Sequence, residues 1–213
     1  MVRRILDQVP DELLQQDLKK YRERALELGA TDAKIITTDI ILIDERVLAK
    51  CVYPKCPHYG TNANCPPYAL EPSMVRKIVN KFHYAIFTKL EVPAEVMAGP
   101  EAREKSAEVP YAVRNHEIIS RIEAEAFYDG YYLALGFAGG SCKSAFCSNV
   151  GCSALEPGQG CRHSLRARSA MEAVGIDAFA MAAKVGWDIY PIGSSTLPSD
   201  IPYGTRLGLV LIY

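Results

Sequence analysis

The spacing of the cysteines constrains this chain more than any other feature of its sequence. The segment that begins at Cys51 reads CVYPKCPHYGTNANC, and the segment that begins at Cys147 reads CSNVGCSALEPGQGC. Both follow the pattern C-x4-C-x8-C, in different halves of the chain. All seven cysteines fall into a first set and a second set, which are Cys51, Cys56 and Cys65, and Cys142, Cys147, Cys152 and Cys161. Thiols grouped in this way are typical of metal or redox chemistry rather than of core packing.

The rest of the composition predicts a cytoplasmic protein. The opening MVRRILDQVPDELLQQ has arginines with no apolar run behind them, so we expect no secretory signal. No stretch reaches the ~18 apolar residues of a membrane-spanning helix, so we expect no membrane partner. Reducing conditions disfavour disulfides, and an odd number of cysteines fits them poorly. A net charge of −1 without a basic stripe predicts no nucleic-acid partner.

The pattern around the cysteines predicts an internal duplication. Each half reads helix, strand, cysteine loop, helix, strand. In the first half we expect helices at 11–29 and 73–82 and strands at 33–44 and 83–91. In the second half we expect helices at 110–128 and 169–185 and strands at 131–140 and 187–193. A last strand covers 206–213. We therefore predict an α/β or α+β fold, packed as one compact domain. Its parts are a first half at 1–92, a connector at 93–109 and a second half at 110–213.

Particular residues set the expected helix ends. Gly29 stops the first helix, whose apolar residues share one face, and Pro110 suits the first turn of the helix at 110–128. Ser73 and Ser169 each lie eight residues after the last cysteine of a set, and both are expected as N-caps. Ser169 and Glu172 also form the S-x-x-E pattern of a capping box.

The cysteine loops favour iron–sulfur clusters over zinc. Structural zinc sites most often use tighter C-x2-4-C pairs, whereas iron–sulfur loops have more varied gaps. Cys56-Pro57 and Cys65-Pro66 repeat the cysteine–proline step of bacterial ferredoxins. We expect one or two [4Fe–4S] clusters. The alternatives are zinc and, less favoured, redox thiols without metal.

The two sets differ by one cysteine. The second set supplies four thiolates for a complete cluster, but the counterpart of Cys142 in the first set is Arg46, which cannot be a ligand. A cluster held by three cysteines keeps one iron open for substrate, as catalytic zinc sites keep an open position. His58 or an acidic side chain could instead fill that position. Cys142 could also complete the first site, and a single cluster could draw ligands from both halves.

Basic residues follow the second set. Arg162, Arg166 and Arg168 precede the helix expected at Ser169, which makes an anion site plausible. They could hold a substrate carboxylate or phosphate, raise the potential of an anionic cluster, or be solvated surface residues. His58 and His163 are candidates for hydrogen bonds near a metal, and more weakly for ligation.

Three segments together resemble a family described only as predicted metal-binding proteins, found mainly in anaerobic archaea and bacteria. They are CPHYGTNANCPPYA (56–69), GGSCKSAFC (139–147) and CRHSLRARSAMEAVGID (161–177). The similarity extends over nearly the whole chain. Some relatives space the second set more tightly, close to C-x2-C-x2-C. The resemblance implies metal binding in an anaerobe and names no reaction.

From these patterns we expect an iron–sulfur protein of redox chemistry or electron transfer, with a redox partner protein or a small-molecule substrate. An enzymatic form would be an oxidoreductase or reductase that uses the open iron at the first set. The alternative is a zinc-binding structural or interaction module without redox activity.

Overall fold

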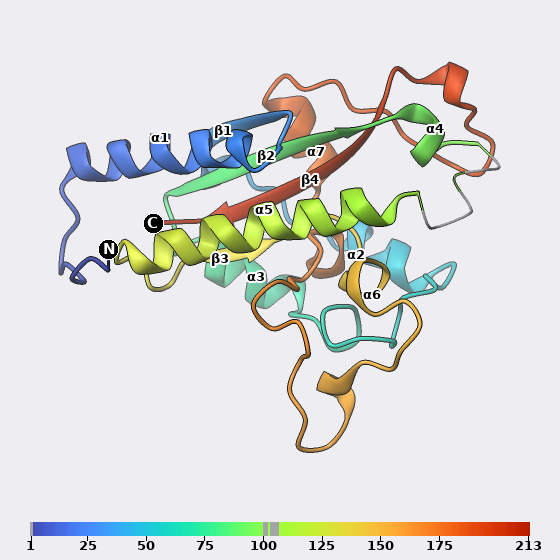
Figure 1. Cartoon of the computed structure of the whole chain (residues 1–213), viewed down its shortest axis with the longest axis horizontal. Coiled ribbons are helices and arrows are strands. Elements are labelled where there is room, and N and C mark those ends of the chain that lie inside the picture. The colour runs from blue at the N-terminus through green and yellow to red at the C-terminus, as the bar shows by residue number, and fades with distance from the viewer. Residues whose placement is uncertain (1, 100–101, 103–106) are drawn as a thin grey trace.

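A mixed α/β fold is built on one antiparallel sheet in the part of the chain that the structure describes (Figure 1). This computed structural model describes residues 2–99, 102 and 107–213. The strand order is β1-β2-β4-β3, with β2 paired to β4 at the centre. The strands are β1 (Asp32–Thr37), β2 (Tyr84–Val92), β3 (Leu135–Phe137) and β4 (Gly204–Leu211). The expected mixed fold in one domain is confirmed.

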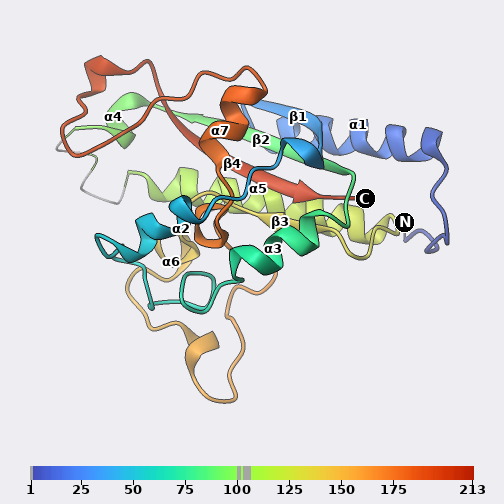
Figure 2. The same ribbon diagram turned by 180° about the vertical axis from the view of Figure 1, so that it is seen from behind.

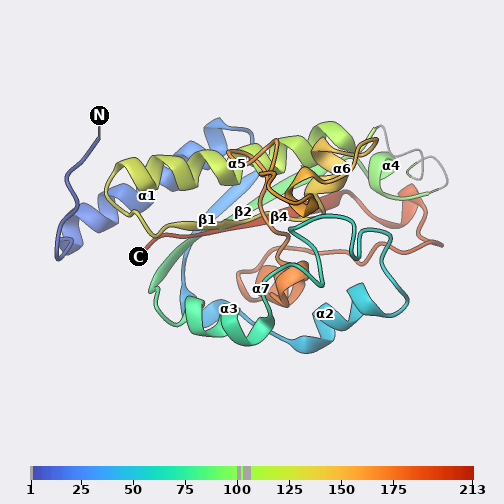
Figure 3. The same ribbon diagram turned by 90° about the horizontal axis from the view of Figure 1, so that it is seen from below.

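Helices cover both faces of the sheet (Figure 3). One face carries α1 (Asp11–Glu27) and α5 (Val109–Tyr128), whose buried side chains pack on Ile86 and Val210. The other face carries α3 (Pro72–Val79), the short 3-10 turn η4 (Glu172–Val174) and α7 (Ala178–Lys184), which pack on Phe87 and Leu209. None of the described helices is long and apolar enough to cross a membrane.

The long helices follow the sequence pattern closely. Leu14, Leu18, Tyr21 and Ala25 form the buried stripe of α1. Gly29 adopts φ +103° just after the helix, the left-handed conformation that ends many helices at glycine. In α5 a proline stands in the first turn. These helix predictions are confirmed.

Two helix starts differ from the expectation. Ser73 lies inside α3, because the helix begins one residue earlier at Pro72 and its N-cap is Glu71. No helix begins at Ser169, since its carbonyl accepts from Ala138 N–H in a parallel bridge to the end of β3. The expected helix 169–185 is instead η4 followed by α7, whose N-cap is Asp177. The capping box predicted for Ser169 and Glu172 is therefore wrong.

Three expected strands are also different. The strand expected over 33–44 ends at Thr37, where the 3-10 turn η1 (Thr38–Ile40) follows. The segment 187–193 forms no strand, and it contains Pro191, which has no N–H to donate to a sheet. The strand expected over 131–140 is reduced to β3 at 135–137. β4 therefore extends past β3 at residues 204–208, and segment 187–193 lies near this end of β4.

The elements of the two halves come in a similar order. α1, β1, α3 and β2 precede the connector, and α5, β3, α7 and β4 follow it. The cysteine loops begin with the short helices α2 (Glu45–Val52) and α6 (Cys142–Phe146). The expected connector 93–109 contains α4 (Ala94–Met97), and its residues 100–101 and 103–106 lie outside the described part. The duplication and the division into halves stay predictions.

Candidate metal centre

Both cysteine loops extend from the same end of the molecule and lie side by side (Figures 1 and 2). Cys51 is in the last turn of α2, and Cys56 and Cys65 follow in the loop before α3. Cys142 is the first residue of α6, and the other three cysteines of the second set follow that position. All seven cysteines are free thiols.

Side-chain caps fix the start of both short helices. Asp44 accepts from Arg46 N–H at the start of α2, and Ser141 accepts from Lys143 N–H at the start of α6. The Arg46 guanidinium turns back onto the Asp44 carboxylate, and its side chain is 91% exposed. Arg46 therefore lies at the exposed rim of the first loop, where it lines the same cavity as Cys51 and Cys56, whereas Cys142 is buried.

The second cysteine set lines one cavity of about 270 Å³. Its wall also contains Asn64, Phe146 and His163. Two N–H groups donate to sulfur there: Asn64 Nδ2 lies 3.4 Å from Cys142 Sγ, and His163 N lies 3.4 Å from Cys161 Sγ. Such hydrogen bonds stabilise thiolate charge and help to set the potential of a cluster.

Two cysteines of the first set, Cys51 and Cys56, line a different cavity, of about 600 Å³, together with Glu172. The Glu172 carboxyl accepts from Gly140 N–H, while its Oε2 is buried without a hydrogen-bond partner among the described residues. Burial raises the pKa of this carboxyl. Glu172 is the acidic side chain that the structure brings to the first set.

Backbone bonds at both ends of segment 169–177 determine the position of Glu172. Met171 N–H donates to Ala138 O at 2.8 Å, next to β3, and Asp177 N–H donates to Leu42 O at 2.8 Å, just before α2. The segment thus connects the strand that leads to α6 with the segment that leads to α2. Glu172 consequently lies between the starts of the two cysteine loops.

The two sets meet at Asn62 and Ser141. The Ser141 hydroxyl lies 3.5 Å from Cys65 Sγ and accepts from Asn62 Nδ2 at 3.3 Å. Cys142 Sγ donates to Asn62 Oδ1 at 3.6 Å. Cys65 of the first set and Cys142 of the second set are therefore joined through the same two polar side chains.

Buried thiols resist ionisation in this protein. Burial raises the pKa of Cys51 and of Cys142 to about 11, and it also raises the pKa of Cys65. Without metal these three thiols are protonated at neutral pH. A bound metal has to displace those protons, so metal uptake by this site releases acid.

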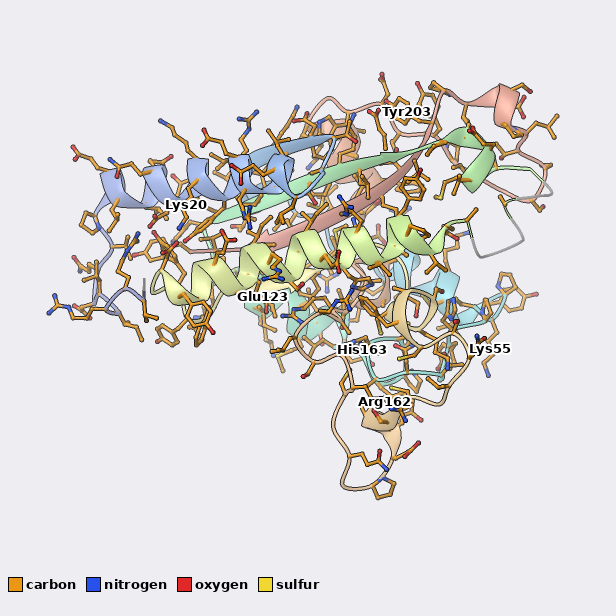
Figure 4. All side chains as sticks on the ribbon, in the orientation of Figure 1. Lys20, Lys55, Glu123, Arg162, His163 and Tyr203 are labelled. Carbon is orange, nitrogen blue, oxygen red and sulfur yellow. The ribbon has the colours of Figure 1, made fainter. Side chains whose placement is uncertain are left out.

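The arginines of the expected anion site are engaged in the structure. Arg166 pairs with Glu117, and Arg168 makes a bidentate pair with Glu123, both on α5. Arg162 donates to the Gly151 carbonyl inside the cysteine loop. Figure 4 labels Arg162 and His163 on the extended loop and Glu123 above them on α5. The anion site at Arg162, Arg166 and Arg168 stays a prediction, and the observed contacts of these residues attach the second loop to α5.

The candidate histidines lie in distinct surroundings. His58 Nε2 is 2.8 Å from Ser144 Oγ on α6, a contact between the two loops. His163 stacks on Phe146 with ring centroids 5.1 Å apart. His116, which the sequence patterns did not indicate, is fully buried on α5. Its ring centroid lies 5.3 Å from that of Phe146. Ligation by His58 or His163 stays a prediction.

Among the described residues, no group of three or more His, Cys, Asp or Glu side chains is arranged to hold a single metal ion. Six of the thiols instead line the two cavities described above, and Cys65 lies buried outside the lining of both. A sequence model of a family described as "Predicted metal-binding protein" matches residues 34–212, which include all seven cysteines. The chain belongs to this family. No curated protein and no solved structure matches the chain.

Membership of the predicted metal-binding family agrees with the resemblance found in the sequence. The matched region extends from the third residue of β1 to the residue after β4, so it contains all of the sheet except Asp32 and Ala33. The family description supports metal binding and does not name the metal. Sequence patterns did not indicate Glu172 as a site residue, because its local pattern resembled a capping box.

Proposed function

We propose that the protein is an iron–sulfur protein that acts in redox chemistry or electron transfer, with a [4Fe–4S] cluster held by Cys142, Cys147, Cys152 and Cys161. The observation that carries the proposal is that these four thiols line one cavity. Four thiolates are the usual ligand set of such a cluster. The N–H groups directed at Cys142 and Cys161 suit sulfur atoms that carry negative charge.

The size of this cavity favours a cluster over a single zinc ion. Its volume is about 270 Å³, much larger than the ~30 Å³ that one water molecule occupies in the liquid. A zinc ion needs its four ligand atoms within about 2.3 Å of one centre, so the loop would have to close around it. A cluster spreads its ligands over several ångströms and suits a wider cavity.

We further propose a second cluster with an open iron at Cys51, Cys56 and Cys65. Arg46, which corresponds in spacing to Cys142, is directed to solvent and paired with Asp44. The first set therefore offers three thiols, two of which line a cavity with room for a ligand. An open iron supplies a position at which a substrate can bind and be reduced or oxidised.

The contact between the two sets supports electron transfer between them. Cys65 is within hydrogen-bonding range of Ser141, and Cys142 is within range of Asn62. Asn62 in turn donates to Ser141. This arrangement suits a closed four-cysteine site that passes electrons to an open three-cysteine site. A redox partner protein would then deliver electrons to the second loop, which extends furthest from the sheet (Figure 1).

The test is anaerobic purification followed by iron, sulfide and zinc analysis and a visible spectrum. We expect brown protein with a broad band near ~400 nm and equal iron and sulfide, at about eight per chain for two clusters or about four for one. Reduction with dithionite should bleach the band. Colourless protein with one or two zinc ions would contradict the proposal and support a zinc-stabilised module.

A further inference from the structure

A third cavity adjoins the one that Cys51 and Cys56 line, on the side of the sheet edge. It has a volume of about 340 Å³ and lies beside residues 205–207 of β4, past the end of β3. The irregular segment 189–192 forms another wall. Glu172, Ala178 and Phe179 line both this cavity and the cavity that contains Cys51 and Cys56. The two spaces therefore meet at Glu172.

Three polar atoms around this cavity are buried without a hydrogen-bond partner among the described residues. They are Glu172 Oε2, Thr205 Oγ1 and Arg206 Nε. Buried polar atoms are nearly always paired, because an unpaired one destabilises the folded protein. Three residues with such atoms on the wall of one cavity indicate a ligand that supplies the missing partners.

Neighbouring groups fix two of these side chains in place. Arg206 is 8% exposed and donates through Nη1 to Gly139 O at 3.0 Å, while Nη2 pairs with Glu108. A Cβ at Gly140 would stand 2.8 Å from Arg206 Nη1, and Gly140 has φ +79°, so only glycine suits this approach. Gly140 N–H also holds the Glu172 carboxyl. The site is pre-formed, with its remaining donor and acceptor atoms left for a ligand.

The chemistry of the walls defines the ligand. Arg206 Nε–H is a donor suited to a carboxylate, beside the Glu108 that Arg206 already pairs with, and the Thr205 hydroxyl on the other face of β4 suits a hydroxyl group. Glu172 Oε2 can pair with a hydroxyl group whether the carboxyl is ionised or protonated. Met97, Phe179 and Ile192 make other parts of the wall apolar. The combination requires a carboxylate, a nearby hydroxyl and an apolar substituent.

We propose that this cavity, at the open edge of β4, binds a small hydroxycarboxylic acid, with its carboxylate at Arg206 and its hydroxyl at Thr205 and Glu172, which lie on the other face of the strand. Binding follows from the cavity alone. The further statement that the bound acid is the substrate of the open iron rests on the proposed function. The structural link is Glu172, which lies between the ligand and the first cysteine set.

Mandelate is a suitable probe, since it carries a carboxylate, an adjacent hydroxyl and a phenyl ring. Isothermal titration calorimetry on the anaerobically purified full chain should give saturable binding at one site. Mandelamide lacks the charge and phenylacetate lacks the hydroxyl, so each should bind at least roughly tenfold more weakly. Absence of mandelate binding up to ~10 mM would overturn the proposal.

Thr205→Val is the variant of choice, because it removes an unpaired hydroxyl with little change of shape. We expect it to weaken mandelate roughly tenfold or more, with thermal stability unchanged or raised. Thr37→Val makes the same change at an exposed position of β1 and should leave binding unchanged. Equal mandelate affinity in Thr205→Val and in the natural chain would overturn the assignment.

Spectroscopy separates this proposal from the proposed function. In brown protein, mandelate should change the electron paramagnetic resonance signal of one cluster, and Glu172→Gln should weaken mandelate binding while the iron content stays the same. If Glu172→Gln instead loses iron with mandelate affinity unchanged, Glu172 is a cluster ligand, and the proposal that it binds the hydroxyl of the acid is wrong. If colourless protein still binds mandelate, the cavity proposal stands and the iron–sulfur function fails.

Discussion

At the scale of residues, the spacing of the cysteines predicts a metal centre but not its surroundings. Asn62 and Ser141 are unremarkable in the sequence, and they come to Cys65 and Cys142 only when the two loops pack together. Arg206 could have been noticed, because it is a charged residue within an otherwise apolar strand. Its partners Gly139 and Glu108 come from other parts of the fold, so no local pattern indicates the cavity.

Single cysteine substitutions distinguish two separate clusters from one shared cluster. Cys152→Ser should remove the second cluster and keep the first, and Cys56→Ser should do the reverse, so each leaves about four iron atoms per chain. The double variant should contain no cluster. Iron and sulfide analysis with the visible spectrum checks this. Complete loss of iron in both single variants would show one cluster with ligands from both loops.

His116 should make the protein less stable in mild acid. Burial, and then the positive charges of Arg168 and Arg166, lower the pKa of His116 to about 4 in the folded protein. The unfolded chain, with a histidine pKa near ~6.5, binds the extra proton first, so protonation favours unfolding as the pH falls from ~6.5 toward ~4. Between pH ~7 and ~5 the loss should be about 2 kcal/mol.

The measurement is urea unfolding at both pH values for the natural chain and for His116→Gln. Both proteins keep Glu117 and Glu123, which pair with the two arginines. The difference between the two proteins therefore isolates His116. An equal loss of stability in both would mean that His116 does not contribute to the pH dependence.

At the scale of elements, periodicity predicts the long helices well and the short ones poorly. α1 and α5 have many residues to define an apolar face, and a glycine follows each within two residues of its end. The region 169–185 contains good helix formers, but Gly175 at φ +83° interrupts it. A Cβ there would also meet Pro72 of α3 at 2.9 Å, a contact that exists only in the folded protein.

The observed and the expected caps make a matched test. Asp177 accepts from Ala180 N–H at 2.9 Å at the start of α7, so Asp177→Ala should lower the free energy of unfolding by about 1 kcal/mol. Ser73 is exposed inside α3, so Ser73→Ala should change it by less than ~0.5 kcal/mol. Urea unfolding monitored by circular dichroism measures both. A larger loss for Ser73→Ala would support the cap expected from the sequence.

At the scale of the whole molecule, the mixed fold was predictable, but the strand order was not. The alternation of helix and strand predicts layers, whereas the pairing of β2 with β4 joins segments from opposite halves of the chain. Side chains of these two strands enter both cores, Ile86 and Val210 on one face and Phe87 and Leu209 on the other. Neither half can bury these side chains without the other half.

This shared sheet predicts that the two faces unfold together. Ile119 on α5 is fully buried, and a Cβ at Gly208 of β4 would overlap its side chain. Ile119→Ala should therefore cost about 2–5 kcal/mol. Trp187 packs on the opposite face, with its ring centroid 4.9 Å from that of Phe87, and reports on that face by fluorescence.

Because β2 and β4 connect both cores, Ile119→Ala should shift the fluorescence midpoint of Trp187 as much as the circular dichroism midpoint in urea. Ile5→Ala, at a residue that is 56% exposed, is the matched control and should change the free energy of unfolding by less than ~0.5 kcal/mol. The experiment should be done with the metal content held constant, since bound metal adds its own free energy to folding. Two separate transitions, with the Trp187 signal unaffected by Ile119→Ala, would mean that the faces unfold independently despite their common sheet.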